Sequence, residues 1–146
     1  MKQILIFTLI LGALILAACN SVDTPVSSGD VIGEEVLVSG GEYTNVSVEE
    51  LQTMFEDKDF VFVNVHIPFA GDIPNTDLSI PFDEIEQNLV QLPTEKDEKI
   101  LLYCRSGSMS SVAAKTLVSL GYTNVWNLDG GFNDWKAAGL PLEGQQ

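Results

Sequence analysis

Cys104 is the residue whose type and neighbours best fit nucleophilic chemistry. It ends the apolar run Lys99–Cys104, and the next six residues, Arg105–Ser110, contain an arginine, a glycine and three serines. A turn of small residues before a helix aims successive backbone N–H groups at one point, where the helix adds partial positive charge. A thiol placed there is biased toward thiolate. We therefore predict a reactive Cys104, the alternative being an inert thiol in the core.

Other residues can complete a site around this thiol. Arg105 is the single arginine of the chain and supplies a fixed positive charge. His66 ends another apolar run, on the side where the site is expected, and either pairs with a charge, responds to pH or serves only the structure. We predict that substrate contacts Arg105, Ser106, Gly107, Ser108, Met109, Ser110 and His66, and that Cys104 is catalytic.

These residues need a scaffold of alternating strands and helices. A capping box at Ser47–Glu50 begins a helix through Glu56. The expected strands are Phe60–Val65, Leu78–Ile80, Lys99–Cys104 and Asn124–Leu128, and the expected helices that follow are Phe82–Leu92, Ser108–Leu120 and Phe132–Ala138. Strands joined through helices by short connections predict an α/β fold with a parallel sheet.

Composition excludes several classes of protein. The 146 residues carry a net charge of −14, which argues against binding of nucleic acid. Two cysteines and one histidine can form neither a disulfide scaffold nor a cysteine- or histidine-rich metal centre. We predict no metal and no cofactor.

The N-terminus has the pattern of an export signal. Met1–Ala18 has one lysine and then an apolar stretch too short for a typical membrane span. Leu16-Ala17-Ala18-Cys19 resembles the lipobox of bacterial lipoproteins, which implies cleavage before Cys19 and a lipid on its thiol. We expect a signal peptide at 1–18, a lipidated Cys19 with a flexible acidic linker at 19–42, and a domain at 43–146. The domain would then sit on the extracytoplasmic face of the cell membrane.

The domain resembles the rhodanese-like sulfurtransferases over about Tyr43–Leu142. The matching segments are Cys104–Gly107 with Met109-Ser110, Gly121–Val125, Leu128–Phe132 and Trp135–Pro141. The resemblance implies a central five-stranded parallel sheet flanked by helices. It also implies a cysteine that takes sulfur from a donor such as thiosulfate, holds it as a persulfide and passes it to cyanide or a thiol.

The chain departs from that family at charged positions. Asn64-Val65-His66 stands where the family usually has Asp-Val-Arg, Asp72 where it often has His, and Met109 where an arginine is common. Fewer positive charges should weaken binding of the thiosulfate dianion, so we expect a neutral or thiol-bound donor.

Three functions follow from these patterns. The first is a membrane-anchored, exported sulfurtransferase, expected to be a monomer, that uses a small sulfur donor and a thiol or cyanide acceptor. The second is a catalytically weak rhodanese-like module that binds sulfur species or a protein partner. The third, a cysteine phosphatase or arsenate reductase, needs Cys-x5-Arg, and Ser110 occupies the position of that arginine.

Overall fold

The strand β5 (Ile100–Tyr103) lies inside the sheet and is buried along its whole length. In the computed structural model, which describes residues 33–145, its side chains alternate between two hydrophobic clusters. Ile100 and Leu102 enter one cluster, and Leu101 and Tyr103 enter the other. A strand that is apolar on both faces requires such a two-sided cover, so the apolar run predicts this strand correctly.

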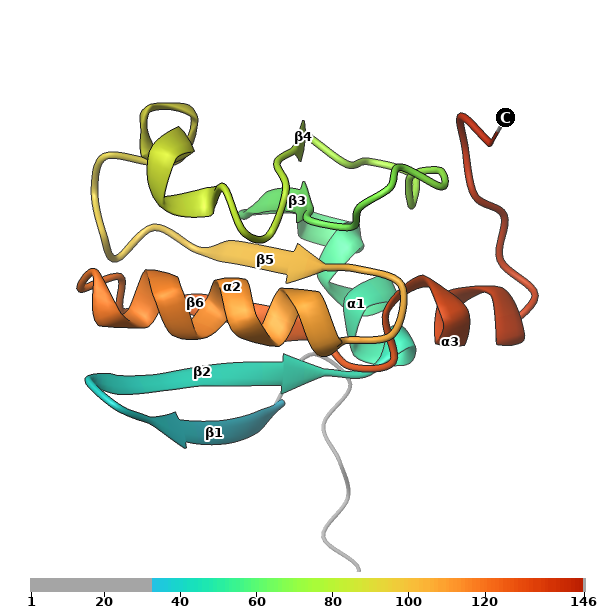
Figure 1. Ribbon diagram of the computed structural model, residues 1–146. Coiled ribbons are helices and arrows are strands. Elements are labelled where there is room, and N and C mark those ends of the chain that lie inside the picture. The colour runs from blue at the N-terminus through green and yellow to red at the C-terminus, as the bar shows by residue number, and fades with distance from the viewer. Residues whose placement is uncertain (1–32, 146) are drawn as a thin grey trace, which may run out of the picture.

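The strands form one mixed sheet in the order β1-β2-β6-β5-β3-β4 (Figure 1). Besides β5 they are β1 (Glu34–Val38), β2 (Gly41–Val46), β3 (Val61–Asn64), β4 (Leu78–Ser79) and β6 (Val125–Leu128). Neighbours from β2 to β4 all run parallel, and β1 pairs with β2 antiparallel. The α/β fold is therefore confirmed, but the sheet has six strands rather than five and is mixed rather than purely parallel.

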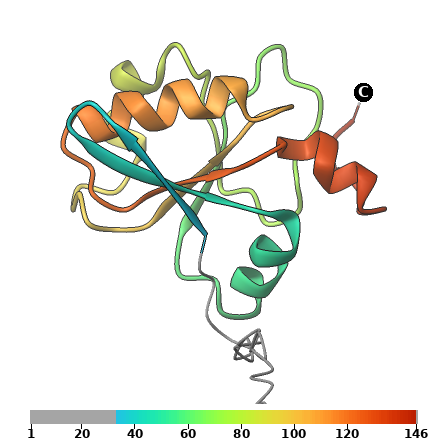
Figure 2. The same cartoon turned by 90° about the horizontal axis from the view of Figure 1, so that it is seen from below.

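Helices cover both faces of this sheet (Figure 2). The helix α2 (Ser108–Ser119) and the 3-10 segment η2 (Ile85–Gln91) pack on one face. The other face holds α1 (Val48–Met54), its 3-10 extension η1 (Phe55–Asp57) and α3 (Gly131–Ala137). Each cluster joins its helices to the sheet, so the loops at the carboxyl ends of the strands rest on rigid elements.

The prediction of a flexible linker at 19–42 is wrong for residues 33–42, where β1 and its turn lie. The part of this segment that the structure describes forms strand and turn, with Val36 and Val38 packed against the cluster under α2. Ser39 and Gly40 make the two-residue turn into β2, with φ +96° at Gly40. The apolar residues Val36-Leu37-Val38 indicate such a strand in the sequence, but the acidic residues and glycines around them favour a linker. The predicted signal peptide at 1–18 and the lipidated Cys19 lie outside the described residues.

Two predicted helices differ in detail. The segment expected as a helix at Phe82–Leu92 contains only 3-10 turns with a kink at Asn88, whose side chain donates to the backbone oxygen of Glu84. Such side-chain bonds compete with helical ones. The helix α2 ends at Ser119, one residue before the expected end at Leu120, and its Val112 is 46% exposed. None of the helices within residues 33–145 is long and apolar enough to cross a bilayer.

Candidate active site

Cys104 directly follows β5 and is 1% exposed. The first turn of α3 holds the backbone around it, because the N–H of Phe132 donates to the oxygen of Cys104 and the N–H of Asn133 to that of Arg105, both at 3.0 Å. In a trans peptide the N–H points opposite to the carbonyl. Because the Arg105 carbonyl points toward α3, the N–H of Ser106 points away from α3, and this N–H is one of the groups that lower the pKa of Cys104.

The helix α2 begins without a side-chain cap. Its N-cap is Gly107, with φ +86°, and no side chain there accepts from the first amides of the helix. Such amides lack partners inside a helix and must find them elsewhere. The backbone N–H groups of Met109 and Ser110 help to lower the pKa of Cys104, and the buried Ser110 hydroxyl donates to its sulfur at 3.5 Å. The start of α2 thus forms a cradle of donors around one sulfur atom.

This cradle changes the acidity of the thiol. Burial raises the pKa of Cys104, but hydrogen bonds from the Ser110 hydroxyl and from the backbone N–H groups of Ser110, Ser106 and Met109 lower it, and the net shift is downward. Hydrogen bonds to a charged form favour that form. The geometry therefore favours the thiolate, by hydrogen bonding rather than through the charge of Arg105, which lies exposed at the rim.

A pocket of about 400 Å³ opens over the sulfur. One side is the loop after β5, and the other is the segment after β3, which we call the wall. The loop contributes Cys104, Arg105 and Ser106, the first turn of α2 adds Ser108 and Met109, and the wall consists of His66, Ile67, Pro68, Phe69 and Ala70. Because β3 and β5 are parallel neighbours, their carboxyl ends bring both segments to one edge of the sheet.

His66 belongs to this wall and is 8% exposed. Its ring meets Phe132 edge to face at 5.2 Å between centroids. Burial and, next, the charge of Arg105 lower the pKa of His66, so the imidazole is neutral at neutral pH. Its Nδ1 is buried and finds no hydrogen-bond partner in the described part of the chain.

Side-chain hydrogen bonds hold the wall in place. Asn64 accepts from the N–H of His66 and donates to the oxygen of Gly71 and to Oδ1 of Asp72, the last at 2.8 Å. The same Oδ1 accepts from the Tyr103 hydroxyl at 3.2 Å. Since Tyr103 immediately precedes Cys104, this network ties the wall to the strand that carries the sulfur.

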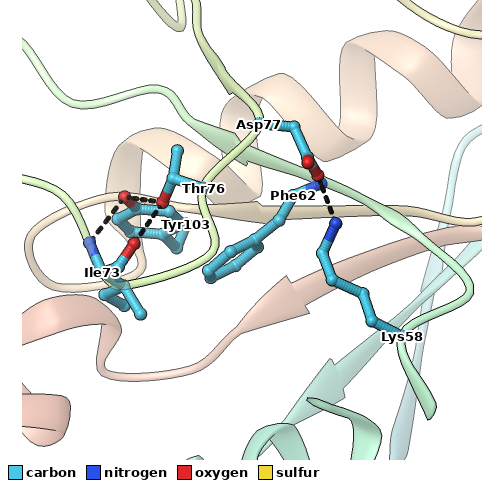
Figure 3. Close-up of polar contacts among 6 residues, drawn as sticks. All are labelled: Lys58, Phe62, Ile73, Thr76, Asp77 and Tyr103. Carbon is cyan, nitrogen blue, oxygen red and sulfur yellow. Dashed lines mark hydrogen bonds and ion pairs between the residues drawn. The ribbon is translucent and has the colours of Figure 1, made fainter.

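The Tyr103 hydroxyl also fixes the chain beyond the wall (Figure 3). It accepts from the N–H of Ile73 at 3.0 Å and lies 2.7 Å from the Thr76 hydroxyl. Burial is the main cause that raises the pKa of this phenol, so the hydroxyl keeps its proton. Figure 3 also shows Asp77 between Lys58 and the backbone N–H of Phe62, which anchors the far end of the same connection.

The structure brings most of the predicted site residues together. Cys104, Arg105, Ser106, Ser108, Met109 and His66 all line the pocket, whereas Gly107 and Ser110 are buried beneath the loop. Sequence reasoning missed the wall residues Ile67–Ala70 and the turn at Gly130-Gly131 that supports the loop. The position of the wall just after a strand was the available signal. Within residues 33–145, no group of three or more His, Cys, Asp or Glu side chains could hold a metal ion.

Comparisons with known proteins agree with this geometry. Residues 47–138 match the model of the rhodanese-like domain. The chain is 30% identical over 103 residues to the thiosulfate sulfurtransferase GlpE of Vibrio cholerae, covering 69% of this chain and 95% of that protein. It is 34% identical over 94 residues to a sulfurtransferase of Allochromatium vinosum, covering 62% of this chain and 85% of the relative.

Solved structures show the same fold. A rhodanese-related protein from Thermoplasma volcanium superposes with a TM-score of 0.58 at 27% identity, covering 68% of this chain and 97% of that one. The chain belongs to the rhodanese-like family. Its sulfurtransferase relatives support a function of the sulfur-transfer type.

Proposed function

We propose that this protein is a lipid-anchored, exported sulfurtransferase that carries sulfane sulfur as a persulfide on Cys104. The observation that carries the proposal is the cradle at the start of α2: the Ser110 hydroxyl donates to the sulfur at the base of the pocket, and the backbone N–H groups of Ser106, Met109 and Ser110 lower the pKa of the thiol. These donors favour a thiolate before the reaction and can hold a persulfide anion after it.

In the first half-reaction the Cys104 thiolate attacks the sulfane sulfur of the donor. A sulfur–sulfur bond forms to Cys104, the sulfur–sulfur bond of the donor breaks, and the donor leaves with that electron pair. With thiosulfate the leaving group is sulfite, and with an organic persulfide it is a thiolate. No external oxidant or reductant is needed, because the oxidation states exchange between the two sulfur atoms.

In the second half-reaction an acceptor attacks the outer sulfur of the Cys104 persulfide. Cyanide leaves as thiocyanate, a thiolate leaves as a new persulfide, and the electron pair of the broken bond returns to Cys104 as thiolate. The cradle donors that stabilised the first thiolate therefore stabilise this leaving group as well.

Intact-mass measurement tests the proposal. Purified protein is incubated with thiosulfate or with an organic persulfide and weighed, then treated with cyanide and weighed again. We expect a gain of one sulfur atom that cyanide removes, and no gain in Cys104→Ser. Absence of the adduct with every donor contradicts the proposal. An adduct that forms but turns over only slowly supports the weak binding module instead, and turnover of an aryl phosphate supports the phosphatase.

The proposed anchor rests on the sequence at Leu16–Cys19. Fractionation of the producing bacterium tests it, with Cys19→Ser as the variant. We expect the parent chain in the membrane fraction with an incorporated fatty acid, and neither property in Cys19→Ser. A parent chain without lipid contradicts the anchor and leaves the chemistry of Cys104 unaffected.

A further inference from the structure

We propose that the sulfur donor is an organic persulfide whose uncharged, apolar side group fills the pocket between Met109 and the wall. This inference rests on the proposed sulfur transfer and names the substrate class of the same site. It follows from the shape, lining and charge of the pocket.

The lining of the pocket beyond the sulfur is largely apolar. Ile67, Pro68, Phe69 and Ala70 form a continuous apolar run along the wall, and Met109 faces the pocket from the loop. Phe69 is 46% exposed, which is high for a phenylalanine in a structure whose other aromatic rings are largely buried. An exposed aromatic ring over a concave site is a common means of binding an apolar ligand.

The pocket has more room than a small inorganic anion needs. Its volume of about 400 Å³ lies within the range of small-molecule sites in proteins. The wall is also preformed, since the Asn64–Asp72–Tyr103 network holds its ends and Asp72 pairs with Glu143 through two backbone hydrogen bonds. A preformed apolar site binds its ligand without the loss of entropy that ordering its own residues would cause.

The charge of the pocket does not suit a dianion. Among the described residues that line it, Arg105 is the one with a permanent charge, and it is exposed at the rim. The neutral His66 adds none, and the net charge of −14 on the whole chain opposes the approach of anions. One exposed guanidinium is better suited to the single negative charge that appears on a departing thiolate.

The transfer balances with this donor. The Cys104 thiolate attacks the terminal sulfur of the protonated form of the donor, R–S–SH; the bond between the two donor sulfurs breaks, and R–S⁻ leaves with the electron pair. The terminal sulfur keeps its hydrogen and becomes the outer sulfur of Cys104–S–SH. The apolar group R remains on the wall until the thiol departs.

A pair of persulfides tests the preference. Benzyl persulfide and 2-sulfonatoethyl persulfide are compared as donors, and each rate of sulfur loading on Cys104 is divided by the rate of the same donor with a small free thiol. We expect the benzyl donor to be favoured by about ten-fold or more, the value of burying one apolar side group. An equal or faster corrected rate with the anionic donor overturns the inference while leaving the proposed sulfur transfer intact. Failure of both donors, and of thiosulfate, overturns the proposed function.

Matched variants locate the effect in the pocket. Met109→Arg should raise loading from thiosulfate and the anionic donor about five-fold or more by adding a charge to the lining. Val112→Arg, on the next turn of α2 and outside the pocket, adds the same charge as a control and should not. Phe69→Ser should reduce the benzyl preference several-fold, whereas Val90→Ser, at a residue 92% exposed and remote from the lining, should keep it. Equal effects of the pocket variants and their controls contradict the assignment.

Discussion

The backbone amides in the first turns of α1 and α2 are bonded in different ways. At α1 the Ser47 side chain accepts from the N–H of Glu50, and the Glu50 carboxylate accepts from the N–H of Ser47. At α2 the N-cap is Gly107, no side chain caps the helix, and the amides of Met109 and Ser110 act on the Cys104 thiol, whose pKa they lower. In α1 the amides are capped by side chains of the same turn, and in α2 they are left to interact with the Cys104 thiol.

The start of α3 explains how the second arrangement holds together. It too has a glycine N-cap without a side chain, but its amides donate to the carbonyls of Cys104 and Arg105. One uncapped helix start thus orients the loop, and the other binds the sulfur. Reactivity at this site depends on backbone geometry that no single polar side chain supplies.

The largest effect is expected at Gly131, which lets α3 approach the loop. Its φ is +57°, and a Cβ there would lie 2.2 Å from the oxygen of Cys104. Gly131→Ala should lower the free energy of unfolding by about 3–5 kcal/mol and slow sulfur loading about a hundred-fold, because the loop must move. Denaturant titration and loading rates measure both effects.

Gly139→Ala is the matched control for this variant. Gly139 also has a positive φ, +80°, but nothing lies within 4 Å of its Cβ position. We expect only the cost of the left-handed conformation, about 1–2 kcal/mol, with unchanged loading. Similar losses in the two variants would show that α3 does not hold the loop.

The wall, unlike the loop after β5, is held by side-chain hydrogen bonds, and a substitution of Asn64 tests how much they stabilise the fold. Asn64→Asp removes the two donor bonds to Gly71 and Asp72 and places a second carboxylate beside Asp72. The free energy of unfolding should fall by about 2–3 kcal/mol at pH 7. The close pair raises a carboxyl pKa in the folded state, so this loss should shrink as the pH falls toward 4.

The double variant Asn64→Asp/Asp72→Asn serves as its control. It restores a donor–acceptor pair with the parent net charge, so it should recover much of the stability. Its thiol should keep the pH midpoint of alkylation found in the parent, because the start of α2 is untouched. A shifted midpoint would mean that the wall also sets the acidity of Cys104.

A smaller effect is expected at the capped start of α1. Ser47→Ala removes the side chain that accepts from Glu50, and this should cost about 1 kcal/mol of stability. Loading and alkylation of Cys104 should stay at parent values. Thermal unfolding and the rates of loading and alkylation of Cys104, measured on the same preparation, check both statements. Slower loading or alkylation would contradict the independence of the two helix starts.

The smallest effect on stability, and a specific one on acidity, is expected for Ser110→Ala. The parent thiol should be alkylated with a pH midpoint below the ordinary value of about 8.5, since hydrogen bonds lower its pKa. Removing the Ser110 hydroxyl should raise that midpoint by up to about one unit. Ser111→Ala, which loses only a bond to the Ser108 carbonyl, is the control and should not move it.

Much of this fold follows from local sequence patterns. The capping box at Ser47–Glu50 predicts α1, and the run at Lys99–Cys104, which is apolar on both faces, predicts β5. Each of these patterns is compatible with one kind of element. β1 was missed because acidic residues and glycines near Val36 and Val38 also suit a linker. An edge strand buries only one face, so its apolar signal is weak.

The site was predictable at its reactive end and less so at its wall. Cys104 and the residues after it are contiguous, and a strand followed by a small-residue turn and a helix indicates their arrangement. Phe69 and Gly131 reach the site only through the pairing of β3 with β5 and the packing of α3 under the loop. Such long-range relations have no marker in the local sequence.

The antiparallel direction of β1 decides where the preceding chain meets the domain. Glu34 pairs with Asn45 near the carboxyl end of β2, so Gly33 lies at the same edge of the sheet as Cys104. Figure 1 shows β1 beginning beside the end of β2. A domain that began at β2 would be entered from the opposite edge. The point at which the preceding chain joins the domain therefore lies at the edge where the pocket opens over Cys104.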